Sequence, residues 1–265
     1  MKTRLWLLAS VMAVILSSTA AWGDGDCYVV VGGGRGIGTK ITSLPFTINK
    51  PGFYYLTDNL SPSTPGNGIT INCDHVTIDL MGFCLNGPTN NWTDTGIVMN
   101  GRQNVEIRNG TMTYWGIGIK ETSDSGIRHR VFNIRAQCFS EGITLQGLGH
   151  IVKGCTITDT IKGITMGVGI ISGCTLSNCQ DWGITGGDTV SGNCTNNCGV
   201  GISIAGGRLI GNTVATTASG QTGIQLPGEL GLSRILIDQN CSYGWGHPYT
   251  GGNVNVVWGK NAGLP

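Results

Sequence analysis

Gly142-Ile143-Thr144-Leu145, Gly163-Ile164-Thr165-Met166 and Gly201-Ile202-Ser203-Ile204 follow one pattern, a Gly-Ile pair, a polar residue and an apolar residue. We assign eight copies of this Gly-Ile pair to a repeat, at Gly68, Gly96, Gly116, Gly142, Gly163, Gly183, Gly201 and Gly223. Successive copies lie between 18 and 28 residues apart. A period near twenty is typical of a coiled repeat architecture, so the spacing predicts a solenoid.

Each repeat has the same internal plan of three short apolar segments. The Gly-Ile segment is followed by a second one, such as Val76-Thr77-Ile78, and by a third that ends at a residue such as Leu176. Alternation with period two predicts β-strands, and three strands per repeat predict a triangular coil. At about 4.8 Å per coil, eight coils extend about 40 Å. Stacked turns are expected at Gly154, Gly173, Gly192 and Gly211, which lie 19 residues apart and precede Cys155, Cys174, Asn193 and Asn212.

The ends of the chain differ from the repeat. Lys2 and Arg4 precede the apolar stretch 5–16 and the small residues 17–21, which together predict a secretory signal peptide. We therefore expect residues 1–23 to be a signal peptide, 24–66 N-terminal strands and a cap, 67–242 a parallel β-helix, and 243–265 a C-terminal cap. The protein is expected to be secreted, either extracellular or periplasmic, with no membrane span after cleavage.

Charge and cysteine content limit the partners. Removal of Lys2 and Arg4 leaves 14 basic and 15 acidic residues, so the formal charge is near −1. This balance argues against nucleic acid, and against an anionic membrane held by net charge. The chain has ten cysteines, and stacked free thiols and disulfides both remain open for them. No spacing typical of a metal site occurs, so neither a metal nor a cofactor is predicted.

The chain resembles right-handed parallel β-helix proteins. The resemblance covers residues 41–242 and rests on the Gly-Ile strands, on Val-Thr-Ile-Asp-Leu-Met-Gly-Phe at 76–83 and on Asn-Val-Glu-Ile-Arg-Asn-Gly-Thr at 104–111. It implies the fold of the pectate lyase-like superfamily, which includes pectate lyases, polygalacturonases, alginate epimerases and exported proteins without assigned activity. The paired Asp residues and Gly-His-Gly of polygalacturonases, and the Asp-Pro-His-Asp of alginate epimerases, do not occur.

Substrate usually lies along the first strand of each coil in the enzymes of these families. The outward positions expected there are Thr70, Val98, Gly118, Thr144, Thr165, Thr185, Ser203 and Gln225, followed by Asn72, Asn100, Lys120, Gln146, Gly167, Gly187, Ala205 and Pro227. Only Lys120 is charged, whereas a lyase needs carboxylates for Ca²⁺ and a base, and a hydrolase needs paired acids. We therefore predict no catalytic residue on this face. Loops at 121–124 and 88–94 stay open as catalytic sites.

The leading prediction is a carbohydrate-binding surface on the first face. Tryptophan rings stack on sugar faces while amide groups orient the hydroxyls. The expected site residues are Asn72, Trp92, Asn100, Trp115, Lys120, Gln146 and Trp182. Packing of these tryptophans into the core is the alternative interpretation.

Two other functions remain open. The second face carries Glu106 beside Arg128 and Arg108 beside Arg130 in the expected register, and Arg128, Arg130 and Lys153 are candidates for an anionic sugar site in a uronate lyase or epimerase. His129 is expected to align with the inward Ile107, as a core or edge histidine. A structural spacer or surface protein that self-associates through caps or sheet faces is the third possibility.

Overall fold

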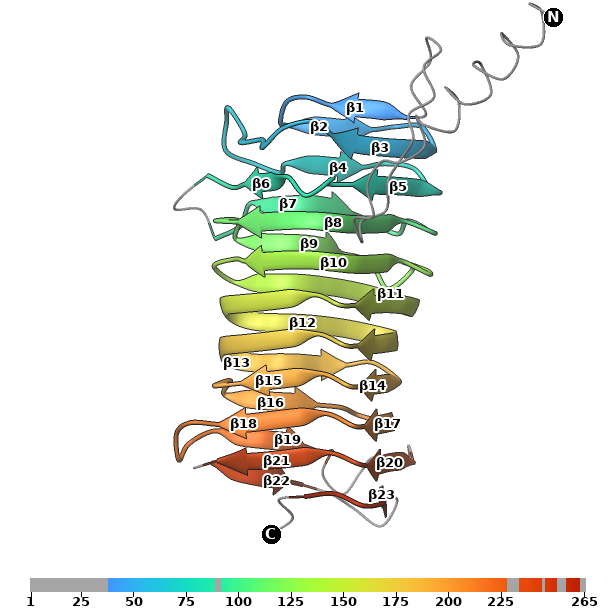
Figure 1. Ribbon diagram of the computed structural model, residues 1–265. Helices are drawn as coiled ribbons and strands as arrows, with labels where there is room; N and C mark the ends of the chain where they lie inside the picture. Colours follow the sequence, from blue (N-terminus) through green and yellow to red (C-terminus); the bar gives the residue numbers. More distant parts are fainter. Residues whose placement is uncertain (1–37, 89–91, 228–233, 245, 252–255, 263–265) are drawn as a thin grey trace, which may run out of the picture. The chain divides into compact units, whose positions relative to one another are not determined.

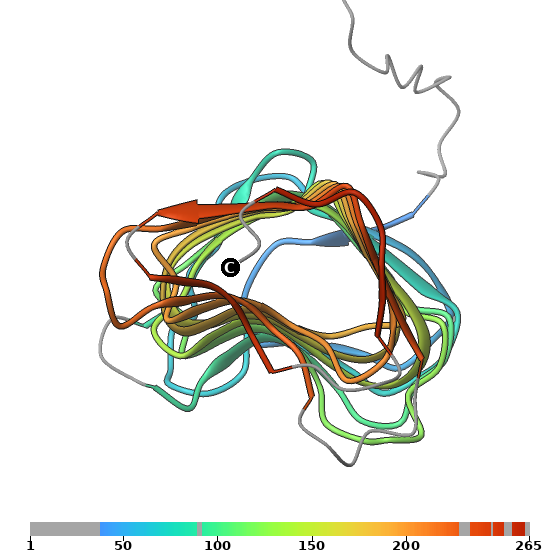
Figure 2. The same cartoon turned by 90° about the horizontal axis from the view of Figure 1, so that it is seen from below.

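The computed structural model describes residues 38–88, 92–227, 234–244, 246–251 and 256–262. Within these ranges the chain forms a parallel β-helix of about nine coils and contains no helix (Figure 1). Each strand pairs in parallel with the equivalent strands of the coils before and after it. Seen along the coil axis, successive coils superpose closely (Figure 2). The fold expected from the repeat is confirmed.

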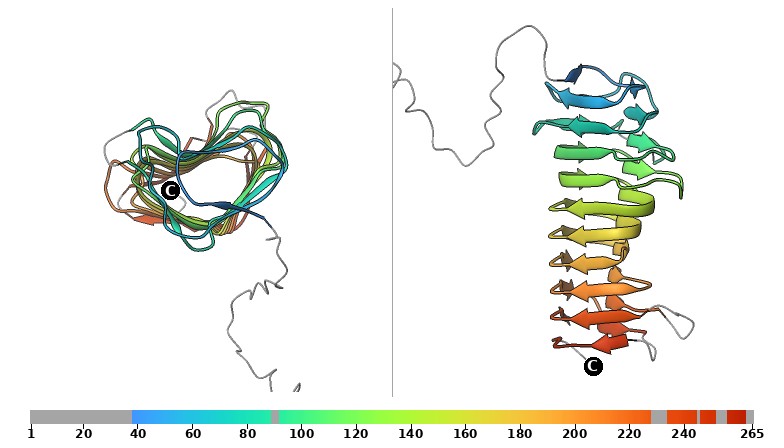
Figure 3. Two further views of the ribbon diagram at one scale, coloured as in Figure 1. Left: turned by 90° about the horizontal axis from the view of Figure 1, so that it is seen from above. Right: turned by 90° about the vertical axis from the view of Figure 1, so that its right-hand side faces the viewer.

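Every coil contributes to three faces, which lie around the axis and run the length of the stack (Figure 3). The first face contains the strands of the Gly-Ile segments, β4 (Ile69–Ile71), β7 (Thr95–Met99), β9 (Ile117–Glu121), β16 (Val200–Ser203) and β19 (Thr222–Gln225), together with β2 (Phe46–Ile48) and β22 (His247–Thr250), which pair with them at the two ends. The long strands β11 (Glu141–Lys153), β12 (Thr156–Ser172) and β13 (Thr175–Gly186) bend around corners and also contribute to it.

The second face follows the first along the chain. It contains β1 (Thr39–Ile41), β3 (Gly52–Leu56), β5 (Val76–Asp79), β14 (Thr189–Ser191), β17 (Gly207–Ile210), β20 (Ile235–Asp238) and β23 (Val256–Trp258). The third face contains β6 (Cys84–Asn86), β15 (Cys194–Asn196), β18 (Thr213–Thr216) and β21 (Cys241–Gly244). Strands β8 (Glu106–Thr113) and β10 (Arg130–Gln137) begin on the second face and end on the third.

The Gly-Ile pair recurs because a side chain has no room at the glycine. A β-carbon at Gly163 would lie 2.4 Å from both the carbonyl oxygen of Gly183 and Cδ2 of Leu176, which points inward from the third face. The equivalent glycines of the other coils would clash with the next coil in the same way, and together they form a glycine column along the stack. One expected member is wrong: Ile97 pairs with Ile119, so Gly118 occupies the column and Gly116 does not. Only glycine lets the first and third faces approach so closely.

The chain turns from the second face to the third at a single residue with left-handed backbone conformation. Asn109, Asn133, Gly154, Gly173, Gly192 and Gly211 have φ between 52° and 65° there. The next residue points inward, and from Asn193 onward it is asparagine. Asn193 Nδ2 donates to Asn212 Oδ1 at 3.0 Å, and Asn212 Nδ2 donates to Asn240 Oδ1 at 2.8 Å. These asparagines therefore form a buried hydrogen-bonded ladder, and Asn261 extends it.

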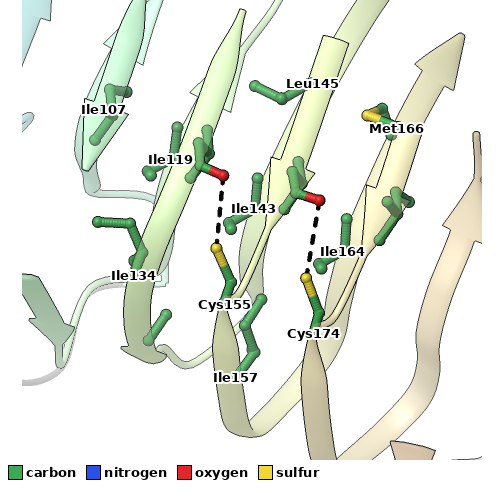
Figure 4. Close-up of a cluster of buried hydrophobic side chains, with 14 of the residues drawn as sticks. Ile107, Ile119, Ile134, Ile143, Leu145, Cys155, Ile157, Ile164, Met166 and Cys174 are labelled. Carbon is green, nitrogen blue, oxygen red and sulfur yellow. Dashed lines mark hydrogen bonds between the residues drawn. The ribbon is translucent and has the colours of Figure 1, made fainter. Parts of the chain in front are cut away.

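The interior is filled by stacked aliphatic side chains and thiols. Ile119, Ile143 and Ile164 point inward from successive coils, with Cys155 and Cys174 opposite them (Figure 4). Every cysteine of the described residues is a free thiol, whereas Cys27 lies outside them. Burial raises the pKa of Cys138 to about 12, so this thiol stays protonated at neutral pH. The described residues include no helix with the length and hydrophobicity that a membrane span requires.

The segments 24–66 and 243–265 were expected to cap the coil stack. Where they are described, they form strands that pair with it. At the N-terminal end β2 pairs with β4 and β3 with β5. At the C-terminal end β22 pairs with β19, β23 pairs with β20, and the expected boundary at residue 242 lies inside β21. The signal peptide expected over 1–23 lies outside the described residues.

Candidate functional site

The seven predicted carbohydrate-binding residues do not form one surface. The predicted role in sugar binding is wrong for Trp115. Its side chain is fully buried, and its Nε1 donates to the carbonyl oxygen of Leu85 at 2.9 Å. Its ring packs against the α-carbons of Gly68 and Gly96, where a β-carbon would lie 2.8 Å and 3.3 Å from ring atoms. Trp115 fills the space that two glycines leave open and is unable to stack on a sugar.

Lys120 also lies elsewhere than expected. It pairs with Val98 and Thr144, so it belongs to the first outward column and not beside Asn100. The cause is the sequence Gly116-Ile117-Gly118-Ile119, in which two Gly-Ile pairs are two residues apart. A shift of two residues keeps the same side chains pointing outward, so alternation alone does not distinguish the two registers.

Asn72, Asn100 and Gln146 lie at the end of the first face that leads to the second. Asn72 and Asn100 border a hollow of about 160 Å³ with Arg102, whose Nε donates to the carbonyl oxygen of Asn100 and whose Nη1 donates to that of Asn72. Asn72 Nδ2 also donates to Asn49 Oδ1 at 3.1 Å. These polar groups hold the turns together, and the two other predicted tryptophans lie at the opposite end of the first face.

Trp92 and Trp182 lie along the corner at which the third face leads to the first. Three aromatic side chains meet at the N-terminal part of this corner: Trp92 is 5.8 Å from Phe139 between ring centroids, and Tyr114 is 6.5 Å from the same ring. Trp92 is 56% exposed and Tyr114 47% exposed. A cluster of large exposed rings of this kind is typical of a binding surface.

Polar side chains continue the same corner through the following coils. Gln137 Nε2 donates to Asp159 Oδ2 at 3.1 Å, and Asn178 Nδ2 donates to Asp159 Oδ1 at 2.9 Å. Asn197 Nδ2 then donates to Asn178 Oδ1 at 2.8 Å. Gln221 Nε2 and Thr217 Oγ1 both donate to Asn197 Oδ1. The result is an outer ladder of amide, carboxylate and hydroxyl groups, held in line by direct hydrogen bonds.

This ladder borders an open groove. The groove has a volume of about 520 Å³ and is lined by Asp159, Asn178, Cys179, Gln180, Asn197, Gly199 and Gln221. Trp182 follows Gln180 by two residues and lies within β13, where that strand reaches the first face. The ammonium of Lys162 lies 5.5 Å from the Trp182 ring centroid, a cation–π contact that fixes the ring.

We call the whole surface the corner strip, comprising Trp92, Tyr114, Gln137, Phe139, Asp159, Asn178, Gln180, Trp182, Asn197, Thr217 and Gln221. It runs parallel to the coil axis. Between Tyr114 and Thr217 it crosses five coil steps, or about 24 Å. The strip combines rings at one end with hydrogen-bonding groups along the remainder.

The basic residues of the second face have a different register from the expected one. Glu106 pairs with Arg130 and Arg108 pairs with Phe132, so neither predicted pair is correct. Glu106 Oε1 accepts from Arg108 Nη1 at 3.0 Å, and Arg108 Nε also bonds to the buried Asp79 at 2.8 Å. These contacts hold neighbouring coils together. His129 is a core histidine, which was one of its two expected roles. It does not align with Ile107, because Val131 pairs with Ile107, and its Nδ1 accepts a hydrogen bond from the backbone N–H of Val105.

Glu121 is one of the two acidic residues, with Asp124, in the segment 121–124 that remained open for catalysis. It is fully buried, and its carboxylate accepts hydrogen bonds from the backbone N–H groups of Gly101, Arg102 and Ser123 and from His129 Nε2. Burial raises its pKa, but these hydrogen bonds together outweigh burial and leave the pKa below its ordinary value. The carboxylate is ionised, fully engaged and inaccessible to a substrate.

No protein-family model matches the sequence, and no curated protein matches it. A parallel β-helix alone does not define an activity, so the function is inferred from the side chains and their geometry.

Proposed function

We propose that this protein is exported and binds a polysaccharide along the corner strip. The observation that carries the proposal is the continuous line of exposed rings followed by amide and carboxylate groups, aligned with the coil axis. Sugar rings present C–H faces that stack on aromatic rings and hydroxyls that bind amide and carboxylate groups. A chain of repeating sugars matches a surface on which similar groups recur in successive coils.

The polar groups of the strip are already oriented in the free protein. Asp159, Asn178 and Asn197 have φ of 54°, 55° and 53°, the left-handed conformation that asparagine and aspartate tolerate best among residues with a side chain. Their hydrogen bonds to one another restrict the side-chain rotamers. Less conformational entropy is therefore lost when a glycan binds, which favours affinity.

A binding function agrees with the distribution of the acidic residues. Asp159 is the acid in the ladder, and it accepts two amide hydrogen bonds. A glycoside hydrolase of the usual kind needs a pair of carboxyl groups on either side of the bond that it cleaves. Both oxygens of Asp159 are already engaged by amide groups, which favours binding over cleavage at the ladder.

Fluorescence and calorimetric titration with pectate, alginate and neutral glycans test this proposal. We expect one of these glycans to bind, and the variants Tyr114→Ala, Trp182→Ala and Asn178→Ala to weaken that binding about fivefold or more each. Trp258→Ala and Asn196→Ala are matched controls, because Trp258 lies on the second face and Asn196 is an exposed residue of the third. Equal loss in strip and control variants, or no binding at all, would contradict the proposal.

The same samples separate binding from catalysis. Reducing ends and the absorbance of unsaturated uronates are followed during a prolonged incubation. New product that disappears in Arg128→Ala would favour a uronate lyase on the second face. Concentration-dependent assembly without glycan binding would favour a structural protein.

A further inference from the structure

A second exposed surface lies on the opposite side of the first face from the corner strip. Five aliphatic side chains meet there: Ile127 pairs with Leu148, Leu148 with Val168, and Ile151 with Ile170. Leu148 is 54% exposed, Val168 40% and Ile170 42%, while Ile127 and Ile151 are half-buried. Scattered apolar side chains on a surface need no explanation, but adjacent ones in register on three coils indicate a contact surface.

Three exposed cations border this apolar cluster. The Arg128 side chain passes over Gly149, with its Cγ 3.5 Å from the position of a β-carbon there, and its backbone N–H donates to the carbonyl oxygen of Leu148. Arg130 pairs with Ile151 and its side chain is 58% exposed. Lys153 follows Ile151 by two residues on the same side of β11. We call these eight residues the basic-apolar patch.

Acidic side chains offset these cations only in part. Glu106 Oε2 lies 3.9 Å from Arg130 Nη1, but its other oxygen binds Arg108 at 3.0 Å. Asp124 is exposed in the preceding loop, and Asp188 is exposed in the following coil, where the exposed Arg208 donates its backbone N–H to the carbonyl oxygen of Asp188. The local charge of the basic-apolar patch is therefore positive, although the formal charge of the whole chain is close to neutral.

We infer that the basic-apolar patch docks the protein on an anionic lipid membrane surface. Aliphatic side chains enter the boundary between headgroups and acyl chains, while arginine and lysine bind the acidic headgroups beside them. Each basic residue near an anionic surface adds to the attraction over a Debye length. Net charge alone argues against this partner, but the fold gathers cations next to exposed apolar groups.

The charges favour a lipid surface over a second copy of the chain. A symmetric dimer through this patch would bring the positively charged patches of the two protomers together. Like charges in an interface oppose association. Because the corner strip lies at the other end of the first face, membrane docking leaves it free for a ligand.

Vesicle co-sedimentation tests the inference on residues 24–265, because the apolar stretch 5–16 would itself bind lipid. The vesicles contain either equal parts of phosphatidylglycerol and phosphatidylcholine, or phosphatidylcholine alone. We expect binding to the anionic vesicles that weakens with salt. The double variant Leu148→Ser/Ile170→Ser and the double variant Arg128→Gln/Lys153→Gln should each reduce binding about tenfold.

Val257→Ser and Arg135→Gln are the matched controls, since Val257 is 57% exposed at the end of the stack and Arg135 is exposed on the third face. Both should bind like the unchanged chain, and thermal unfolding should confirm that every variant is folded. Absence of binding to anionic vesicles, or equal loss in patch and control variants, would overturn the inference. Self-association that the Leu148→Ser/Ile170→Ser variant abolishes would overturn it in favour of a dimer.

Discussion

His129 Nε2 lies 3.1 Å from Glu121 Oε2, and both side chains are fully buried at the corner between the first and second faces. The other ring nitrogen of His129 accepts the backbone N–H of Val105, so the proton resides on Nε2 and is donated to the carboxylate. The ring also stacks on His150, with centroids 4.9 Å apart. This network connects three coils through polar groups in an otherwise apolar interior.

Replacing Glu121 by glutamine should destabilise the coil stack. The carboxylate accepts hydrogen bonds from four donors, and an amide would turn an NH₂ group toward some of them. Loss of acceptors in a buried charged network costs about 2–4 kcal/mol. Urea unfolding of Glu121→Gln measures the change, with Asp124→Asn in the adjacent exposed loop as the control. An unchanged unfolding midpoint in Glu121→Gln would show that the carboxylate is not needed.

Acid should weaken the fold through His150. Burial lowers the pKa of His150 from 6.5 to about 4, because the charged form loses its hydration. The unfolded chain therefore binds a proton that the folded chain does not, and the free energy of unfolding falls as pH decreases from about 6.5 to 4. Glu121 adds a loss in a lower window, below its ordinary pKa of 4.5, because its pKa is lowered in the fold.

Unfolding titrations at several pH values check this dependence. The variant His150→Gln keeps an acceptor for the His129 N–H and a donor for the carbonyl oxygen of Gln146, both of which bond to His150. Its stability should change less between pH 6.5 and 4 than that of the unchanged chain. An identical slope in the two proteins would rule out His150 as the source.

The inner asparagine ladder should be essential for the C-terminal coils. Asn212 accepts from the backbone N–H of Asn193 and donates to Asn240 Oδ1 and the carbonyl oxygen of Val190. Asn212→Ala leaves these buried groups without partners, at a cost of about 2–4 kcal/mol. Chemical denaturation should show this loss, whereas Asn196→Ala on the exposed third face should change stability by less than about 0.5 kcal/mol.

The effect of a glycine-to-alanine substitution on stability should depend strongly on whether the glycine lies in the glycine column. A β-carbon at Gly183 would lie 2.6 Å from the carbonyl oxygen of Gly201, so Gly183→Ala must push two coils apart. We expect a loss of about 2–4 kcal/mol in unfolding free energy. Gly220 has no heavy atom within 4 Å of the same position, so Gly220→Ala is the matched control. Similar stability of the two variants would mean that the coils accommodate a side chain in the column.

The sequence predicts the coil well because glycine and asparagine positions follow backbone geometry. Gly154, Gly173, Gly192 and Gly211 occupy left-handed corners, as their constant spacing indicates. The register between Gly96 and Gly142 was harder to predict, since Gly116 and Gly118 both precede isoleucine and differ by one period of a strand. Neither pattern nor propensity shows that Trp115 enters the interior, because that depends on the space at Gly68 and Gly96 in other coils.

The corner strip could be predicted only in part. Trp92 and Trp182 belong to it, but Tyr114 and Phe139 come together from two coils and show no shared pattern. A signal did exist for its polar part: Asp159, Asn178 and Asn197 lie 19 residues apart, the same interval as the glycine corners. Residues of this type at one repeat interval indicate an exposed left-handed corner, and therefore an aligned row of side chains.

Titration calorimetry with a length series of the best-binding glycan tests the polysaccharide proposal most directly. The corner strip extends about 24 Å across five coil steps, so affinity should rise with glycan length until the chain spans it and then level off. In Asn178→Ala, at the centre of the strip, the gain with length should be smaller. Affinity that is independent of length, or that rises equally in Asn178→Ala, would contradict binding along the strip.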